Sequence, residues 1–411
     1  MQRSQPHGRS DAAVRARAVL LWADMWRYRS QRVSSRARSA ISAVGNSAAM
    51  RQISSIIKHK GEDDVQMSLN GRRLANMWID TWPCAPLKRA GHAIILLILG
   101  LPIAAQAAES PSPITPPGGT DLYQAVLPPE SGLYGVVIAM PIGRNFHSYD
   151  AQGNQAPASM NAVYDSPTFA GALMYVYPFG VLGGRLMSSA AISAQHYSFK
   201  VGDGSHVDQS EGAWGNIYSD IFYWTRNVGL LGAEKGVVPL PYGLNVGAGF
   251  AMTIPTGTYD EAQALRGLPQ PVEPVFSFVP NFAMTYITAT NWLTPASSLQ
   301  LSARAFFGFP TENKTTNYQN GDTYDVDFSV GERIGPVVAG LAGYYQAQYN
   351  DDVVNGITKS DSRYSYWGLG PVLEYDIPQY NMSMKAKFQQ QFDVKNSLDM
   401  QILSFSVAIK F

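Results

Sequence analysis

Apolar and polar side chains alternate along much of the second half of the chain, most clearly at its end. There, Leu403, Phe405, Val407, Ile409 and Phe411 occupy one set of positions, and Ser404, Ser406, Ala408 and Lys410 occupy the other. A period of two places the two sets on opposite sides of a β-strand. The stretch 382–389 repeats the pattern, with Met and Phe on one side and Ser, Lys and Gln on the other.

Similar alternating stretches recur between turn signals such as Asn320-Gly321-Asp322 and Asn355-Gly356. We interpret about twelve of them as strands. Their predicted bounds are 133–142, 168–178, 183–198, 215–226, 237–254, 274–289, 298–309, 323–334, 336–349, 362–376, 380–393 and 399–411. The third and fourth are weakly patterned. The fold class is therefore predicted to be all-β.

A soluble β-sandwich alternates in the same way, so other features must decide between it and a membrane barrel. One face of the predicted strands carries large apolar residues, and the other carries Gly, Ser, Asn and charged pairs. Aromatic residues cluster at predicted strand ends, as an interfacial girdle requires: Tyr242, Tyr286, Trp292, Tyr324, Trp367 and Tyr375. We predict a transmembrane antiparallel β-barrel of about twelve strands, whose closure leaves no unpaired edge in the lipid bilayer.

An export signal precedes the predicted barrel. Lys88 and Arg89 are followed by an apolar run at 93–105 and by Ala105-Gln106-Ala107, a small-residue cleavage site. As a helix, thirteen residues reach only ~20 Å, which is short for a membrane anchor, the alternative interpretation. We assign 86–107 to a signal peptide cleaved at Ala105 and Ala107. A Pro-rich N-terminal segment at 108–132 and a barrel at 133–411 follow.

The charge is divided unevenly along the chain. Residues 1–92 contain 16 Lys+Arg and 6 Asp+Glu, whereas the remainder contains 15 and 25, so the net charge of zero joins two unlike parts. The basic extension at 1–85 is either disordered or reflects a misassigned start, with Met67 and Met77 as alternative starts. Its basic patches lack interleaved aromatic residues, so we expect no nucleic-acid partner. The one cysteine, Cys84, precedes the signal.

Catalytic chemistry has little support in the pattern. The exported part holds His147, His196 and His206 without an H-E-x-x-H or G-x-S-x-G motif. Calcium could bind the acids at 322, 325, 327, 351 and 352, but we favour solvated loop and lumen acids. We therefore predict no enzyme, no catalytic residue, no cofactor and no metal.

The second half resembles the family of MetA-pathway phenol-degradation proteins. The residues that carry the resemblance are Ile254-Pro255-Thr256-Gly257-Thr258-Tyr259, the run 309–321 (FPTENKTTNYQNG), the run 340–348 (GLAGYYQAQ), Leu369-Gly370-Pro371 and the closing strand. The likeness covers about 215–411 and extends more weakly from 133. It implies an outer-membrane transporter or channel for aromatic and other apolar compounds. The proline-rich stretch 258–274 departs from the asparagine-rich, aromatic region that the family implies.

The predicted function is therefore a channel in the outer membrane of a Gram-negative bacterium for passive uptake of small apolar or aromatic solutes. Twelve strands lie between the filled eight-stranded and the open sixteen-stranded barrels, so the pore should be narrow. Charges on its wall would orient solutes. The candidate lumen-lining residues are Asn245, Asn281, Arg304, Asp325, Asp327, Glu374, Lys385 and Lys387. The alternative is a barrel without an open pore, either structural or a lipid-acting hydrolase.

The last residue of the chain has a predicted role of its own. The apolar closing strand ends on Phe411, which resembles the C-terminal signal of outer-membrane barrels. The resemblance implies that Phe411 is read by the outer-membrane assembly machinery, which would then be a partner of this chain together with the bilayer.

Overall fold

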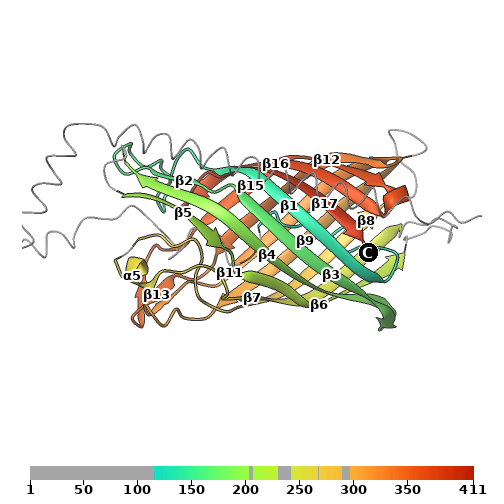
Figure 1. Cartoon of the computed structure of the whole chain (residues 1–411), viewed down its shortest axis with the longest axis horizontal. Helices are drawn as coiled ribbons and strands as arrows, with labels where there is room; N and C mark the ends of the chain where they lie inside the picture. Colours follow the sequence, from blue (N-terminus) through green and yellow to red (C-terminus); the bar gives the residue numbers. More distant parts are fainter. Residues whose placement is uncertain (1–114, 116, 203–206, 230–241, 267, 289–296) are drawn as a thin grey trace, which may run out of the picture. The chain divides into compact units, whose positions relative to one another are not determined.

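The computed structural model describes residues 115, 117–202, 207–229, 242–266, 268–288 and 297–411. Twelve long strands follow one another around a closed antiparallel sheet (Figure 1). They are β1 (Gly132–Arg144), β3 (Thr168–Val181), β4 (Gly184–Val201), β6 (Ile217–Gly229), β7 (Gly243–Ile254), β8 (Ser277–Ile287), β9 (Ser297–Pro310), β11 (Thr323–Ile334), β12 (Val337–Gln348), β15 (Ser365–Ile377), β16 (Met382–Lys395) and β17 (Gln401–Lys410).

The first and last of these strands close the barrel. β1 pairs antiparallel with β17, with Tyr134 opposite Lys410 and Val137 opposite Val407. A register shift between Ala139 and Ile142 interrupts this ladder once. Each long strand corresponds to one predicted from the alternation, and the predicted all-β barrel of twelve strands is confirmed. In the part of the chain that the structure describes, no helix has the length and apolarity to cross a membrane.

The ends of the predicted strands differ in places from the structure. Strand β7 begins at Gly243, and most of its predicted start at 237–242 lies outside the described residues. Several short elements in the connections were not predicted, because stretches of two to eight residues are too short to show a clear alternation. They are β2 (Ala162–Asp165), β5 (Val207–Trp214), α5 (Glu261–Ala264), β10 (Tyr318–Gln319), β13 (Asp352–Val354), β14 (Ile357–Lys359) and the 3-10 helix η1 (Pro378–Tyr380).

The connections at the two ends of the barrel are unlike each other. At the end near the C-terminus, β3 joins β4 through Leu182 and Gly183, whose φ angles of 50° and 73° lie in the left-handed region that a tight turn requires. Long connections gather at the opposite end, where Figure 1 shows α5 and β13. There β10, β13 and β14 form a small separate sheet.

The outer surface of the barrel is apolar over most of its circumference. The exposed large residues include Val137, Phe169, Leu173, Ile192, Phe222, Phe282, Leu301, Val330, Leu341, Leu373, Met384 and Phe405. The rings of Phe222, Phe250 and Phe278 stack across three strands, with successive centroids 6.4 Å apart. Monomers in water rarely expose so large an apolar surface, and a transmembrane barrel requires one. The outside of the barrel is therefore suited to a lipid bilayer.

Three predicted segments remain untested by the fold. The basic extension at 1–85, the signal peptide at 86–107 and its cleavage positions Ala105 and Ala107 lie outside the described residues. The Pro-rich segment predicted at 108–132 is described from residue 115 onward, with residue 116 excepted, and leads directly into β1.

Candidate functional site

The chain fills its own barrel with the residues that precede β1. We call residues 115 and 117–131 the lumen segment. Several of its side chains are buried among the inner faces of the strands: Thr115, Asp121, Leu122, Gln124, Ala125 and Leu127. Sequence analysis assigned no role to this segment, because it shows neither alternation nor a helical period. The interior is therefore occupied by a separate segment of the chain and not only by strand side chains.

An ion-pair cluster holds the middle of the lumen segment. The Lys385 Nζ lies 2.5 Å from Asp121 Oδ1 and 3.2 Å from Glu374 Oε2. The Lys387 Nζ lies 3.1 Å from Asp121 Oδ2 and also donates to the backbone oxygen of Gly118. Three candidate lumen-lining residues, Glu374, Lys385 and Lys387, thus meet around an acid that sequence analysis had not singled out.

A second carboxylate binds the start of the same segment. Asp327 on β11 accepts hydrogen bonds from the Gly118 and Thr120 backbone N–H groups, at 2.6 and 2.8 Å. It also accepts one from the Thr120 hydroxyl at 2.6 Å. Gly118 has a φ of 66°, and a Cβ there would lie 2.6 Å from the Tyr344 ring, so this position requires glycine. Asp327 therefore binds the lumen segment, and its carboxylate is not available to a solute.

Inner-face side chains also satisfy the backbone of the lumen segment, which pairs with no strand. Each buried N–H group needs an acceptor. The contacts are Tyr123 N to Gln300 Oε1 (3.2 Å), Gln124 N to Ser302 Oγ (2.9 Å) and Ala125 N to Thr285 Oγ1 (2.9 Å), while the Tyr223 hydroxyl donates to the Gln124 oxygen (2.7 Å). All these contacts are hydrogen bonds, and none of them holds the segment covalently.

Arg304 lies at the centre of a separate cluster inside the barrel. Its guanidinium lies 2.7 Å from Asp220 Oδ1 on β6, and it donates to Asn281 Oδ1 on β8 at 2.8 and 3.1 Å. The same group lies 4.1 Å from the centroid of the Tyr223 ring. Asn245 is also buried, but it bonds to Asn227 at 2.9 Å and is not part of this cluster.

The expectation that the acids near the outer loops and in the lumen are solvated is wrong for three of them. Asp325, Asp327 and Asp352 are completely buried. Asp352 accepts hydrogen bonds from the Tyr318 hydroxyl and Gln348 Nε2, each at 2.5 Å. Burial raises the pKa of Asp352, and these hydrogen bonds oppose the rise. Among the described residues, no group of three or more His, Cys, Asp or Glu could hold a metal ion.

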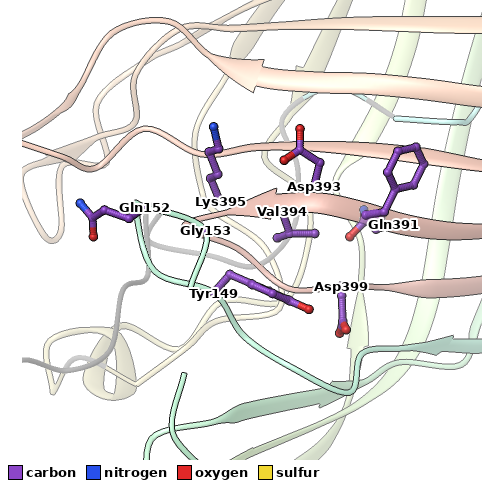
Figure 2. Close-up of a pocket in the computed structure, with 9 residues that line it drawn as sticks. Tyr149, Gln152, Gly153, Gln391, Asp393, Val394, Lys395 and Asp399 are labelled. Carbon is purple, nitrogen blue, oxygen red and sulfur yellow. The ribbon is translucent and has the colours of Figure 1, made fainter. Parts of the chain in front are cut away.

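The long connections pack together at the end of the barrel that lies away from the C-terminus. Residues 269–273 are buried. The Glu273 backbone oxygen accepts from Asn216 Nδ2 at 2.8 Å, and its carboxylate accepts from Asn320. Near the β16–β17 turn, Asp399 lies 2.9 Å from His147 Nδ1. Figure 2 shows a shallow pocket in this region, with Tyr149 directed toward Asp399.

The sequence contains one signal for the lumen segment, namely two inward-facing lysines with too few acids opposite them. Lys385 and Lys387 occupy the same predicted inner face, and only Glu374 lies directly opposite one of them on the next strand. A second buried lysine needs an acid partner. Because Asp121 is remote in sequence, no period could identify it as that partner.

The comparisons with known proteins agree with this architecture. A family model described as "Putative MetA-pathway of phenol degradation" matches residues 147–406. The COG4313 outer membrane channel from Pseudomonas putida F1 is 15% identical, with 71% of this chain and 100% of that chain covered and a TM-score of 0.54. At this identity the likeness concerns the fold. No curated protein matches the chain.

Two further solved structures are barrels with weaker likeness. The β domain of the Bordetella autotransporter BrkA is 8% identical, with 68% of this chain and 99% of that chain covered and a TM-score of 0.36. The CymD monoaromatic hydrocarbon channel is also 8% identical, with coverages of 71% and 91% and a TM-score of 0.33.

Proposed function

Because this chain belongs to the MetA-pathway phenol-degradation family, we propose that it is an outer-membrane channel for passive uptake of small apolar or aromatic compounds. The proposed location is the outer membrane of a Gram-negative bacterium, where the apolar outer surface would contact lipid. In this proposal the chain catalyses no reaction. The lumen segment would close the channel at rest, and its displacement would open a path for solute.

One observation carries the proposal: the interior is filled by a separate segment held by hydrogen bonds and ion pairs. A barrel whose own strand side chains filled it would leave no path. The wall left behind would present the candidate lumen-lining residues Asn245, Asn281, Arg304, Asp325, Asp327, Glu374, Lys385 and Lys387. It would also present aromatic rings such as those of Tyr223 and Tyr344, which offer apolar surface to a passing solute.

A disulfide lock of the lumen segment tests the proposal. Ala125 N and Thr285 Oγ1 are 2.9 Å apart, so the two residues are in contact and Ala125→Cys with Thr285→Cys is the pair to cross-link. The predicted signal peptide excludes Cys84 from the exported form. Cells expressing the variant would be exposed to N-phenylnaphthylamine, an apolar dye that an intact outer membrane excludes. The rate of its fluorescence rise would be measured.

We expect dye entry to exceed that of cells without the protein, to fall to their level under oxidation and to recover after reduction. The single variants Ala125→Cys and Thr285→Cys are the matched controls and should not respond to oxidation. Equal dye entry in the locked and unlocked states, or none above background, would replace the channel by the alternative of a closed barrel.

A further inference from the structure

The carboxylate of Asp325 is an anomaly inside the barrel. It is completely buried on β11, and neither of its oxygens lies within hydrogen-bond distance of a partner, although the Thr115 hydroxyl is close enough to interact with it. Arg304, Arg333, Lys385 and Lys387 have acid partners elsewhere, namely Asp220, Asp376 and Asp121. Asp327, two residues away on the same face, is bonded to the lumen segment. Asp325 is therefore an acid without a basic partner, at a point where burial makes its charged form costly.

Other polar atoms around Asp325 are also unsatisfied. Thr323 lies two positions earlier on the same face of β11 and is completely buried, and its hydroxyl has no hydrogen-bond partner. The buried Tyr218 hydroxyl also lacks a partner and lies within electrostatic range of Asp325. Native structures leave few buried polar atoms unpaired, so these groups could bind a polar molecule.

Tyrosines lie on the strands next to this carboxylate. Asp325 lies opposite Gln346 on β12, and Gln346 lies opposite Tyr366 on β15. The Tyr366 ring is 6.2 Å from that of Tyr344 and 5.8 Å from that of Tyr364. All three rings, with that of Tyr218, are within electrostatic range of Asp325. Aromatic faces attract cations, and an aromatic cage is a recognised site for organic ammonium groups.

We propose that Asp325 and these four tyrosines bind a small organic cation, a protonated amine with an aromatic or apolar body. The inference rests on the proposed function in one respect, that solute travels through the interior. The ammonium group would donate to the Asp325 carboxylate and the Thr323 hydroxyl. The aromatic or apolar body of the amine would lie against the tyrosine rings. Thr115 of the lumen segment lies beside the site, where its hydroxyl accepts from Gln346 Nε2 at 2.8 Å. Cation and segment would therefore compete.

Three probes that share one ring test the charge that the site requires. Benzylammonium, benzyl alcohol and benzoate would each be dialysed at pH 7 against the full chain in detergent micelles, and bound probe would be measured. We expect one equivalent of benzylammonium to bind at least tenfold more tightly than benzyl alcohol, and benzoate not to bind. Asp325→Asn should weaken benzylammonium binding at least tenfold and leave the alcohol unchanged.

Two further variants keep the test decisive. Asp351→Asn removes an acid that pairs with Arg363 at 3.3 Å on the outer connection, and it should bind as the wild type does. Tyr364→Leu removes one ring while it retains the carboxylate, and it should weaken benzylammonium binding several-fold even if Asp325→Asn fails to fold. Equal binding of alcohol and ammonium, or no binding, overturns the inference. A barrel that binds the ammonium but takes up no dye contradicts only the channel.

Discussion

Lys385 on β16 and Asp121 in the lumen segment form an ion pair across 264 residues of sequence, with 2.5 Å between Nζ and Oδ1. Both side chains lie inside the barrel, and Lys387 contacts the same carboxylate. Removing one partner of a buried pair costs about 3–5 kcal/mol, because the other charge is left uncompensated. Of the contacts that hold the lumen segment inside the barrel, this cluster is therefore the one whose loss should weaken that hold most.

Asp121→Asn should release the lumen segment for a larger fraction of the time. The substitution keeps the size of the side chain but leaves Lys387 without an acid partner. Each ~1.4 kcal/mol lost from the closed state raises the open fraction about tenfold. We expect a clear increase in single-channel activity in planar bilayers. The control is Glu312→Gln, because Glu312 pairs with Lys314 on a connection outside the lumen segment. Identical traces for Asp121→Asn and the wild type would contradict this function of the pair.

Reversing the charge of both lysines should change which ions pass. Lys385→Glu with Lys387→Glu replaces attraction to Asp121 by repulsion, so the segment should leave, and the exposed wall would carry two added acids. We expect larger conductance and a reversal potential under a salt gradient that shifts toward cation selectivity. A matched variant, Lys385→Gln with Lys387→Gln, should open the barrel with a smaller shift. If the reversal potential moves toward anions, these residues do not line the conducting path.

The two faces of β17 should respond differently to an added charge. Val407 is 37% exposed on the outside, whereas Ser406 belongs to the opposite set and lies opposite Lys385. An arginine at the lipid face near the midplane costs ~2–4 kcal/mol. Val407→Arg should therefore reduce the folding yield into lipid vesicles, and Ser406→Arg should fold. Equal damage by the two substitutions would indicate a sheet buried on both sides.

The barrel was predictable because the alternation of apolar and polar residues arises within each strand. Alternation reports which face a side chain occupies, and Leu403 to Phe411 shows this without knowledge of any partner strand. The lumen segment was not predictable for the opposite reason. Its buried N–H groups are satisfied by Gln300, Ser302 and Thr285, which are more than 150 residues away. Such contacts depend on closure of the sheet and leave no period in the sequence.

The same distinction applies to the candidate site residues. Sequence analysis placed Arg304, Lys385 and Lys387 on the predicted inner face from alternation alone. It could not pair Arg304 with Asp220, because β6 and β9 are separated by two strands and the contact crosses the interior. It also treated Asp325 as solvated, since alternation does not tell an open interior from a filled one.

Phe411 should contribute to assembly more than to stability. It lies just beyond β17, its N–H donates to the Leu133 oxygen at 2.9 Å, and the residue is 72% exposed. The small loss of contact predicts that Phe411→Ser folds normally when refolded into vesicles. In cells, however, the variant should reach the outer membrane in lower amounts, and unfolded protein should accumulate in the periplasm. Phe405→Ser, which makes the same replacement within β17, is the comparison. A normal membrane yield of Phe411→Ser would argue against an assembly signal.

The Arg304–Asp220 pair should stabilise the barrel only as a pair. The two side chains lie 2.7 Å apart and are 6% and 7% exposed. Arg304→Met leaves Asp220 buried without a counter-charge and should cost about 3–5 kcal/mol, while replacing both partners costs far less. We therefore expect Arg304→Met to lower the urea midpoint of unfolding from vesicles strongly. Adding Asp220→Asn to it should restore most of the loss. The coupling energy from the four proteins of this cycle is the measurement. Additive losses would mean that Asn281 and the Tyr223 ring, and not Asp220, hold the guanidinium in place.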